Sequence, residues 1–328
     1  MTSISARAVV RKFGRNWLSV ALSLSVAVFA ALILWHLLRD VDIDDVIAAL
    51  SAQPIGNIAI AGLFAVAGYV TLTFYDVFAL RIIGRRAVPF RVAALASFTS
   101  YTIGHSLGAA TLTGGLVRLR VYSAWGLDVL DVAKIAFVTG MTFWLGNAVV
   151  LGGAISYAPE AASVVDRLPP WSNRAIGIAA LLGIVCYLAW LTPRPRSLGY
   201  ANWKIILPSL RFTLLQIGIG ATDLMLVTLA MYTLLPPSPA IGFAPVLVIF
   251  VTATLLGTVS HLPGSLGVIE AALLVGLPQF RKEELLAALL TFRVIYFVIP
   301  FLLATLALGL RELGLLARVR RCVKTTKA

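Results

Sequence analysis

Long apolar runs alternate with short polar segments along most of the chain. The runs cover approximately residues 17–38, 55–80, 92–112, 129–157, 173–191, 205–235, 241–260, 266–279 and 285–310. About 20 apolar residues in a helix are enough to cross the hydrocarbon core of a bilayer. The polar segments between the runs are too short for a soluble domain. The pattern therefore predicts a single integral membrane domain over residues 1–328, with an all-α polytopic fold of about eight helical segments.

Basic residues gather in some of the polar segments, and this asymmetry orients the helices. Cytoplasmic segments of membrane proteins carry an excess of Lys and Arg. We therefore expect four segments on the cytoplasmic side, which are the N-terminal tail, 81–91, 194–204 and the basic tail 311–328. The aspartate-rich segment 40–45 is expected outside, where 41–53 is typical of an amphipathic surface helix. The run 17–38 has the length of a full span and no small-residue cleavage site, so we interpret it as a retained helix.

This orientation requires that two of the apolar segments enter and leave the membrane on the same side. Three runs lie between the basic segments 81–91 and 194–204, and three full crossings would put those segments on opposite sides. We therefore expect a re-entrant hairpin over 92–126, broken at Gly114-Gly115. A second, opposed hairpin is expected over 241–279, broken at HLPGSLG (261–267). The prediction is six crossings plus two hairpins, with both termini inside.

The two halves of the chain resemble each other. Asp76 precedes the glycines of TGGLVR, and Asp223 precedes those of PGSLGVIE at a similar distance. With the orientation above, the halves run in opposite directions through the membrane. We predict an inverted repeat, with repeat one over about 55–157 and repeat two over about 205–310. Transporters built this way bind substrate near the bilayer midplane, where broken helices meet.

Composition and charge exclude several classes of protein. The chain is 60% hydrophobic and 12% charged, and its formal net charge is +13. We attribute the positive charge to cytoplasmic segments and anionic lipid, and not to nucleic acid. No GxxxxGK[ST] motif is present, so no nucleotide-driven motor is expected within this chain. Cys186 and Cys322 are far apart in sequence and no Cys/His cluster accompanies them, so we expect neither a metal nor another cofactor.

Charged residues within apolar runs are the candidates for function. A charge near the bilayer centre is costly, so such residues should face protein or water and pair with one another. We expect Asp76 to pair with an arginine of the first hairpin, and Glu270 to pair with Arg293. Arginine binds phosphate through a bidentate fork, and a glycine turn exposes N–H groups to an anion. Two sets of site residues follow: a lipid-headgroup set of Arg118, Arg120, Gly114, Gly115, His105 and Tyr122, and a polar core of Asp76, Asp223, His261, Gly264, Glu270 and Arg293.

Structural roles compete with these functional ones. The buried charges could be internal staples without a ligand, His105 and His261 could simply be hydrogen-bonded, and Tyr122 and Trp125 could anchor the chain at headgroup level. Ser106, Ser260 and Glu270 form no recognisable nucleophile–base set, so an enzyme is not expected, although an intramembrane lipid-modifying enzyme stays an alternative.

Three segments resemble a known family. They are TFYDVFALRIIG (73–84), SYTIGHSLGAATLTGGLVRLRVYSAWGL (100–127) and SHLPGSLGVIEAALL (260–274), and TFRVIYFVIP (291–300) agrees with the family's last segment. The chain is similar to the membrane domain of the lysylphosphatidylglycerol synthase/flippase family, the multiple peptide resistance factors. The PGxLGVxE segment is shared with wider relatives linked to hopanoid and glycolipid handling. The resemblance implies a stand-alone flippase domain without the soluble synthase domain.

These observations together predict a protein of the bacterial inner membrane that flips or scrambles a phospholipid. The resemblance implies aminoacylated phosphatidylglycerol as the lipid and a role in antimicrobial peptide resistance. A separate lipid-modifying synthase could be a partner, and the oligomeric state is open, with a dimer as one option. The alternatives are a non-transporting partner or regulator of such an enzyme, and a transporter of hopanoid- or glycolipid-type lipids.

Overall fold

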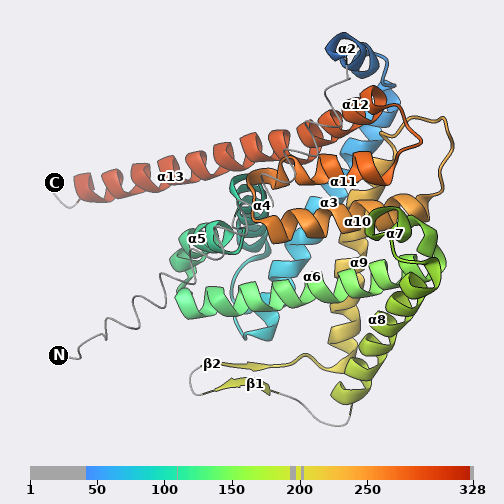
Figure 1. Cartoon of the computed structure of the whole chain (residues 1–328). Coiled ribbons are helices and arrows are strands. Elements are labelled where there is room, and N and C mark those ends of the chain that lie inside the picture. Colours follow the sequence, from blue (N-terminus) through green and yellow to red (C-terminus); the bar gives the residue numbers. More distant parts are fainter. Residues whose placement is uncertain (1–41, 109, 193–196, 201–202, 326–328) are drawn as a thin grey trace, which may run out of the picture.

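The computed structural model describes residues 42–108, 110–192, 197–200 and 203–325 (Figure 1). This part of the chain is almost entirely helical. The first half comprises α2 (Ile43–Ser51), α3 (Ile55–Ile82), α4 (Phe90–Leu107), α5 (Ala110–Tyr122), η1 (Ser123–Trp125), α6 (Val129–Tyr157), α7 (Pro159–Asp166) and α8 (Pro170–Leu191). The second half comprises β1 (Ser197–Tyr200), β2 (Trp203–Ile206), α9 (Leu210–Tyr232), α10 (Phe243–Ser260), η2 (Pro263–Ser265), α11 (Val268–Gly276), α12 (Lys282–Arg293), η3 (Val294–Val298) and α13 (Ile299–Thr325).

Six helical segments in the described residues are long and apolar enough to cross a membrane. They are 55–82, 129–157, 170–191, 210–232, 243–260 and 282–311. The prediction of an all-α polytopic membrane protein is confirmed. The predicted span 17–38 lies outside the described residues. Helix α10, which the sequence predicted to be one arm of a hairpin, is instead one of the six segments long enough to cross. The predicted amphipathic helix over 41–53 is α2.

One short element departs from the helical prediction. Strands β1 and β2 form an antiparallel two-stranded hairpin in the basic segment after α8, with Ser197 opposite Ile206. The hairpin lies beyond the ends of α8 and α9 in Figure 1, away from the helical body. It therefore leaves the helical class of the fold unchanged.

The first hairpin is formed by α4 and α5, but its break is not where the sequence placed it. The chain turns at Gly108, with φ 77° and ψ 176°, whereas Gly114 and Gly115 lie inside α5. The predicted break at Gly114-Gly115 is wrong. A Cβ atom at Gly114 would lie 2.9 Å from the carbonyl oxygen of Ser100, so this glycine lets α5 pack closely on α4.

The second hairpin breaks where the sequence predicts. Helix α10 ends at Ser260, the chain turns through η2, and α11 begins at Val268. The nine residues of α11 extend only about 14 Å, less than half of the hydrocarbon core. Helix α10 has 18 residues and is long enough to cross, so the two arms of this hairpin differ in length.

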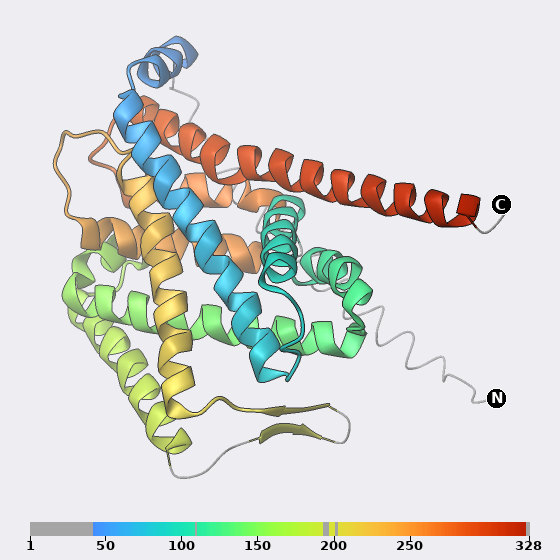
Figure 2. The same ribbon diagram turned by 180° about the vertical axis from the view of Figure 1, so that it is seen from behind.

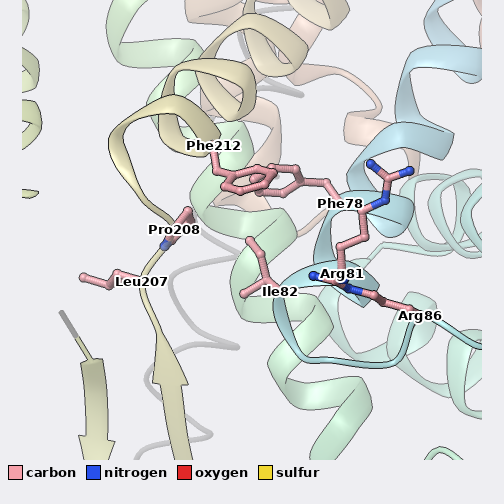
Figure 3. A pocket seen from close by; sticks show the side chains of 7 residues that line it. All are labelled: Phe78, Arg81, Ile82, Arg86, Leu207, Pro208 and Phe212. Carbon is pink, nitrogen blue, oxygen red and sulfur yellow. The ribbon is translucent and has the colours of Figure 1, made fainter. Parts of the chain in front are cut away.

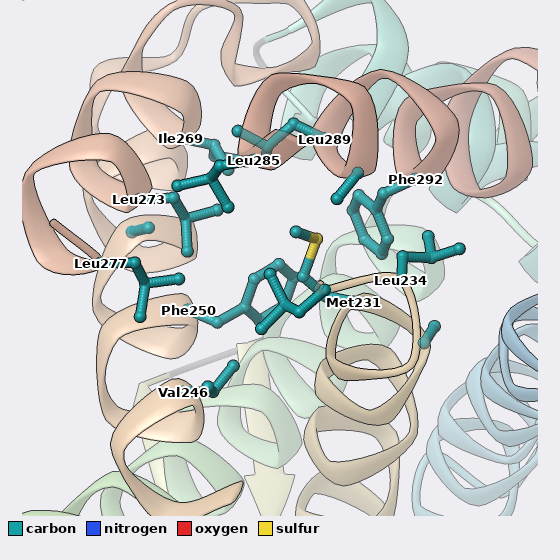
Figure 4. Close-up of a cluster of buried hydrophobic side chains, with 14 of the residues drawn as sticks. Met231, Leu234, Val246, Phe250, Ile269, Leu273, Leu277, Leu285, Leu289 and Phe292 are labelled. Carbon is teal, nitrogen blue, oxygen red and sulfur yellow. The ribbon is translucent and has the colours of Figure 1, made fainter. Parts of the chain in front are cut away.

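A large apolar cluster holds the second hairpin against the rest of the protein. It joins α9, α10, α11 and α12, and Figure 4 shows Met231, Phe250, Leu273, Leu289 and Phe292 pointing into its centre. The rings of Phe250 and Phe292 pack edge to face, with centroids 5.5 Å apart. Seen from behind in Figure 2, α3 and α9 cross the body side by side. Helix α8 lies at the periphery, with only three buried residues, Asn173, Gly177 and Leu191.

We expect Gly220→Ala to destabilise the protein, because α6 and α9 cross in backbone contact. A Cβ atom at Gly220 would lie 2.4 Å from the carbonyl oxygen of Thr142. Overpacking of this kind costs about 1–3 kcal/mol. Thermal unfolding in detergent measures the effect. Gly218→Ala on the same helix is the matched control, because nothing lies within 4 Å of its added methyl group. Equal unfolding temperatures for the two variants would contradict the close crossing.

Candidate functional site

The turns of the two hairpins are in direct contact. A Cβ atom at Gly108 would lie 2.8 Å from the carbonyl oxygen of His261 and 3.0 Å from the backbone nitrogen of Pro263. The turn of the second hairpin is tightly bent, since His261, Gly264, Ser265 and Gly267 all have positive φ. Irregular backbone at membrane depth occurs only where it is buried in protein or lines a water-filled cavity. The contact between the turns defines the centre of the candidate site.

A buried ion pair ties the first hairpin to α3. Arg118 of α5 donates from Nη2 to Oδ1 of Asp76 at 2.8 Å, and from Nε to Oδ2 at 3.1 Å. The hydroxyl of Tyr122 donates to the same carboxylate at 2.7 Å. All three residues are buried, with Asp76 at 0% exposure. The predicted pairing of Asp76 with an arginine of the first hairpin is confirmed, and Tyr122 is part of the pair and not an anchor at headgroup level.

A second ion pair ties the other hairpin to α12. Arg293 donates from Nε to Oε1 of Glu270, and from Nη1 to the carbonyl oxygen of Gly264 at 2.9 Å. The other oxygen of Glu270 accepts from the backbone N–H of Gly267 at 2.9 Å. The predicted pair of Glu270 and Arg293 is confirmed. Arg293 therefore bonds the turn at Gly264 directly and, through Glu270, helps to hold Gly267 at the start of α11.

The π-helical turn η3 begins directly after Arg293. Such turns interrupt helices frequently at functional sites. The carbonyl oxygen of Tyr296 in this turn accepts from the hydroxyl of Tyr69 on α3 at 2.9 Å. This hydrogen bond joins the two halves of the chain, and it lies close to Arg293, which holds the second hairpin.

The structure separates the remaining predicted headgroup residues. Arg120 lies on an exposed side of α5, two residues from the buried Arg118, and Gly115 is a helical residue with open space around it. His105 lies in the last turn of α4, and its ring is 5.9 Å from that of Tyr101. Because Nε and Nη2 of Arg118 are bonded to Asp76, a lipid phosphate could bind these two groups only by displacing that carboxylate.

Two tyrosines that the sequence analysis did not single out link the two halves. The hydroxyl of Tyr75 donates to Oδ2 of Asp223 at 3.1 Å. Its ring lies edge to face with that of Tyr101, and the guanidinium of Arg118 lies 4.7 Å from the centroid of Tyr101. A row of side-chain contacts, through Tyr75, Tyr101 and Arg118, thus runs from Asp223 to Asp76. The sequence did hold a signal for them. Tyr75 stands next to Asp76, and Tyr101 lies in the same apolar segment as His105.

Several buried polar atoms near the hairpins and between α6 and α9 have no hydrogen-bond partner among the described residues. They include Oγ of Ser100 and Ser106 on α4, Oδ1 of Asn147 on α6, Oε1 of Gln216 and Oδ1 of Asp223 on α9, and Nη2 of Arg293. A buried polar group without a partner is unfavourable by about 1–3 kcal/mol, so native proteins rarely leave such groups together unless water or a ligand reaches them. These atoms favour a hydrated interior between the two halves.

A pocket of about 430 Å³ opens where α3 ends and α9 begins (Figure 3). Arg81 and Arg86 lie on one side of it and Leu207 and Pro208 on the other, with Phe78, Ile82 and Phe212 completing the lining. The neighbouring Arg85 is bonded instead to Asp131 of α6 at 2.7 Å. This pocket places the basic segment that follows α3 beside the start of α9, on the same side of the described structure.

Comparison with known proteins places the chain among multi-pass inner membrane proteins. The chain is 33% identical to slr0712 of Synechocystis over 276 residues, which are 83% of this chain and 85% of that protein. It is 32% identical to the inner membrane protein YbhN of Escherichia coli over 289 residues, which are 85% and 83% of the two chains. No family model matches the sequence. The chain belongs to the family of the inner membrane protein YbhN.

A third relative is more distant and much longer. Phosphatidylglycerol lysyltransferase of Staphylococcus haemolyticus is 25% identical over 309 residues, which are 90% of this chain but 35% of that protein. The similarity therefore covers nearly all of this membrane domain and about a third of the relative.

We expect Arg118→Met to be strongly destabilising, because it leaves the Asp76 carboxylate buried without its cation. Breaking a buried ion pair on one side costs about 3–5 kcal/mol. Replacing both partners, as in Asp76→Asn/Arg118→Met, should restore part of the loss. Thermal unfolding of the protein in detergent measures all three. Arg120→Met is the control two residues away on the exposed side of α5, and a loss as large as that of Arg118→Met would contradict the assignment.

Proposed function

We propose that the protein moves a phosphate-bearing lipid between the leaflets of the inner membrane. The observation that carries this proposal is the meeting of two broken helical hairpins inside a membrane domain, beside two arginine–carboxylate pairs. Broken helices that meet at the midplane are the binding sites of inverted-repeat transporters. The similarity to phosphatidylglycerol lysyltransferase supports a lipid as the substrate.

An inverted repeat is part of this proposal. In the first half a long helix, a hairpin and a second long helix follow one another as α3, α4–α5 and α6. In the second half the same order recurs as α9, α10–α11 and α12–η3–α13. The two hairpins meet at their turns, as the halves of an inverted repeat would. The corrected turn at Gly108 replaces Gly114 as the counterpart of the turn around Gly264.

The pocket between α3 and α9 supplies the first headgroup site in this proposal. Arginine binds phosphate through charge-assisted, often bidentate hydrogen bonds. Arg81 and Arg86 have no ion pair with a described residue, whereas Arg118 and Arg293 are bonded to carboxylates. The aromatic rings of Phe78 and Phe212, with centroids 6.2 Å apart, provide an apolar surface for the upper acyl chains. Phosphatidylglycerol and its lysyl form share the phosphate that these arginines would bind.

In the proposed path the headgroup moves from this pocket into the polar interior beside the hairpin turns, while its acyl chains stay in the bilayer. The unpartnered oxygens of Ser100, Asn147 and Gln216 would exchange hydrogen bonds with water or with the headgroup along the way. The two ion pairs hold the hairpins in position and leave the headgroup to be bound elsewhere.

Leaflet translocation in reconstituted liposomes tests the function. Fluorescent phosphatidylglycerol, its lysyl form and phosphatidylcholine are each followed by quenching from the outside, with empty liposomes as the baseline. We expect the wild-type protein to accelerate movement of a phosphatidylglycerol lipid. Movement of none of the three by folded protein would contradict the proposal and favour a non-transporting partner of a lipid-modifying enzyme.

The same assay tests the pocket. We expect Arg81→Gln/Arg86→Gln to reduce the rate for phosphatidylglycerol about tenfold, which corresponds to about 1.4 kcal/mol of lost binding. Arg91→Gln is the matched control, because Arg91 is an exposed arginine of the same basic segment outside the pocket. Equal rates for the double variant and the control would show that general basic charge, and not the pocket, holds the headgroup.

A further inference from the structure

Four carboxylates are buried in the part of the chain that the structure describes, and they are not compensated equally. Asp131 is bonded to Arg85. Asp76 is bonded to Arg118, and Glu270 is bonded to Arg293. Asp223 of α9 is 8% exposed and has no ion pair with a described residue. Its contact is the hydroxyl of Tyr75, which donates to Oδ2, and its Oδ1 has no hydrogen-bond partner among the described residues.

The ionisable groups that face Asp223 are phenols. They come from three elements: Tyr69 and Tyr75 on α3, Tyr101 on α4 and Tyr296 in η3. Helix α10, which packs against α9, carries no ionisable side chain, and α6 presents the hydroxyl of Thr142, which accepts from Gln216 of α9. The charged groups of the neighbouring polar site are Arg118 and Arg293, and both are bonded to other carboxylates. No described residue therefore offers Asp223 a cation.

An ionised carboxylate in this position is unfavourable. A charge at the centre of a membrane helix costs about 2.5–3.5 kcal/mol on insertion scales. A buried acid without a paired cation relieves this cost by taking up a proton. Protonation of Oδ1 forms a neutral acid whose O–H can donate, while Oδ2 keeps the hydrogen bond from Tyr75.

We propose that Asp223 is a proton-binding site, and that proton exchange there drives the rearrangement of the two halves of the protein. The position of Asp223 supports the coupling. Tyr75 lies next to Asp76 in sequence, and the row of Tyr75, Tyr101 and Arg118 leads from Asp223 to the ion pair that holds the first hairpin. Loss of the charge on Asp223 weakens a charge-assisted hydrogen bond at the start of this row. The coupling rests on the proposed lipid translocation, whereas the proton site does not.

A proton fits this site better than a metal cation. Sodium or a divalent ion requires several converging oxygen ligands. The described residues contain no group of three or more His, Cys, Asp or Glu side chains that could hold a metal ion. The side chain bonded to Asp223 is a phenol whose O–H group donates a hydrogen bond to the carboxylate.

Infrared difference spectroscopy of the wild-type protein in lipid nanodiscs tests the proton site directly. A protonated carboxylic acid has its own carbonyl stretching band, which disappears when the group ionises. We expect a buried acid band that titrates with pH, is missing in Asp223→Asn and changes frequency in Tyr75→Phe. Asp131→Asn is the matched control, because that aspartate is paired with Arg85, and the band should be retained in it.

The outcomes separate the proton site from the proposed function. Absence of the band in wild type, its persistence in Asp223→Asn, or its loss on addition of sodium at constant pH would overturn the proton site. In proteoliposomes that move phosphatidylglycerol, an imposed pH gradient should change the wild-type rate several-fold and leave Asp223→Asn unaffected. A rate that ignores the gradient in wild type would overturn the coupling. A protein that shows the band but moves no lipid would retain the proton site and contradict lipid translocation.

Discussion

Every polar group inside a bilayer has to be satisfied within the protein or by water that the protein admits, and this requirement organises the whole structure. Helices α4 and α10 end at Leu107 and Ser260, and the turns that follow leave backbone groups outside helical hydrogen bonding. The chain meets the requirement by placing the two turns against each other and bonding each hairpin to a long helix. Arg293 bonds the turn of the second hairpin through the carbonyl of Gly264, and Arg118 holds the second arm of the first.

The two ion pairs play the same structural part with reversed chemistry. In the first half the long helix supplies the acid, Asp76, and the hairpin supplies Arg118. In the second half the hairpin supplies Glu270 and the long helix supplies Arg293. Neutral pairs of this kind position a hairpin without leaving a net charge in the membrane. In the proposed function, lipid recognition therefore falls to groups that have no such partner among the described residues, which are the pocket arginines and the oxygens of the interior.

Sequence reasoning predicted the helical class because the apolar runs are long and well separated. Run 129–157 coincides with α6, and the break at 261–267 was visible because Pro263 and three glycines or serines interrupt an apolar segment. The pairing of Asp76 and Glu270 with arginines followed from the cost of burying a charge in lipid.

The break of the first hairpin was misplaced because Gly-Gly is the stronger turn signal in sequence than a single Gly108. The structure uses Gly114 for close helix packing, a role that depends on the position of Ser100 on another helix. The pocket was missed for a similar reason. Arg81 and Arg86 are ordinary cytoplasmic arginines until the fold brings Leu207 and Phe212 beside them. A single sequence carries no pattern that reveals contacts between residues more than a hundred positions apart.

Access of water to the hairpin turns tests most directly whether they meet in a hydrated site inside the membrane. Leu107 and Leu266 are 55% and 59% exposed beside the two turns, and Leu182 is 58% exposed on the peripheral helix α8. Each is changed to cysteine in a chain with Cys186 and Cys322 replaced by alanine, reconstituted in liposomes and treated with a membrane-impermeant thiol reagent. Thiols react as thiolates, which form only where water reaches them. We predict labelling at positions 107 and 266 and protection at 182. Protection at all three positions would show that the turns meet in a dry interior, and would contradict a path for a polar headgroup between them.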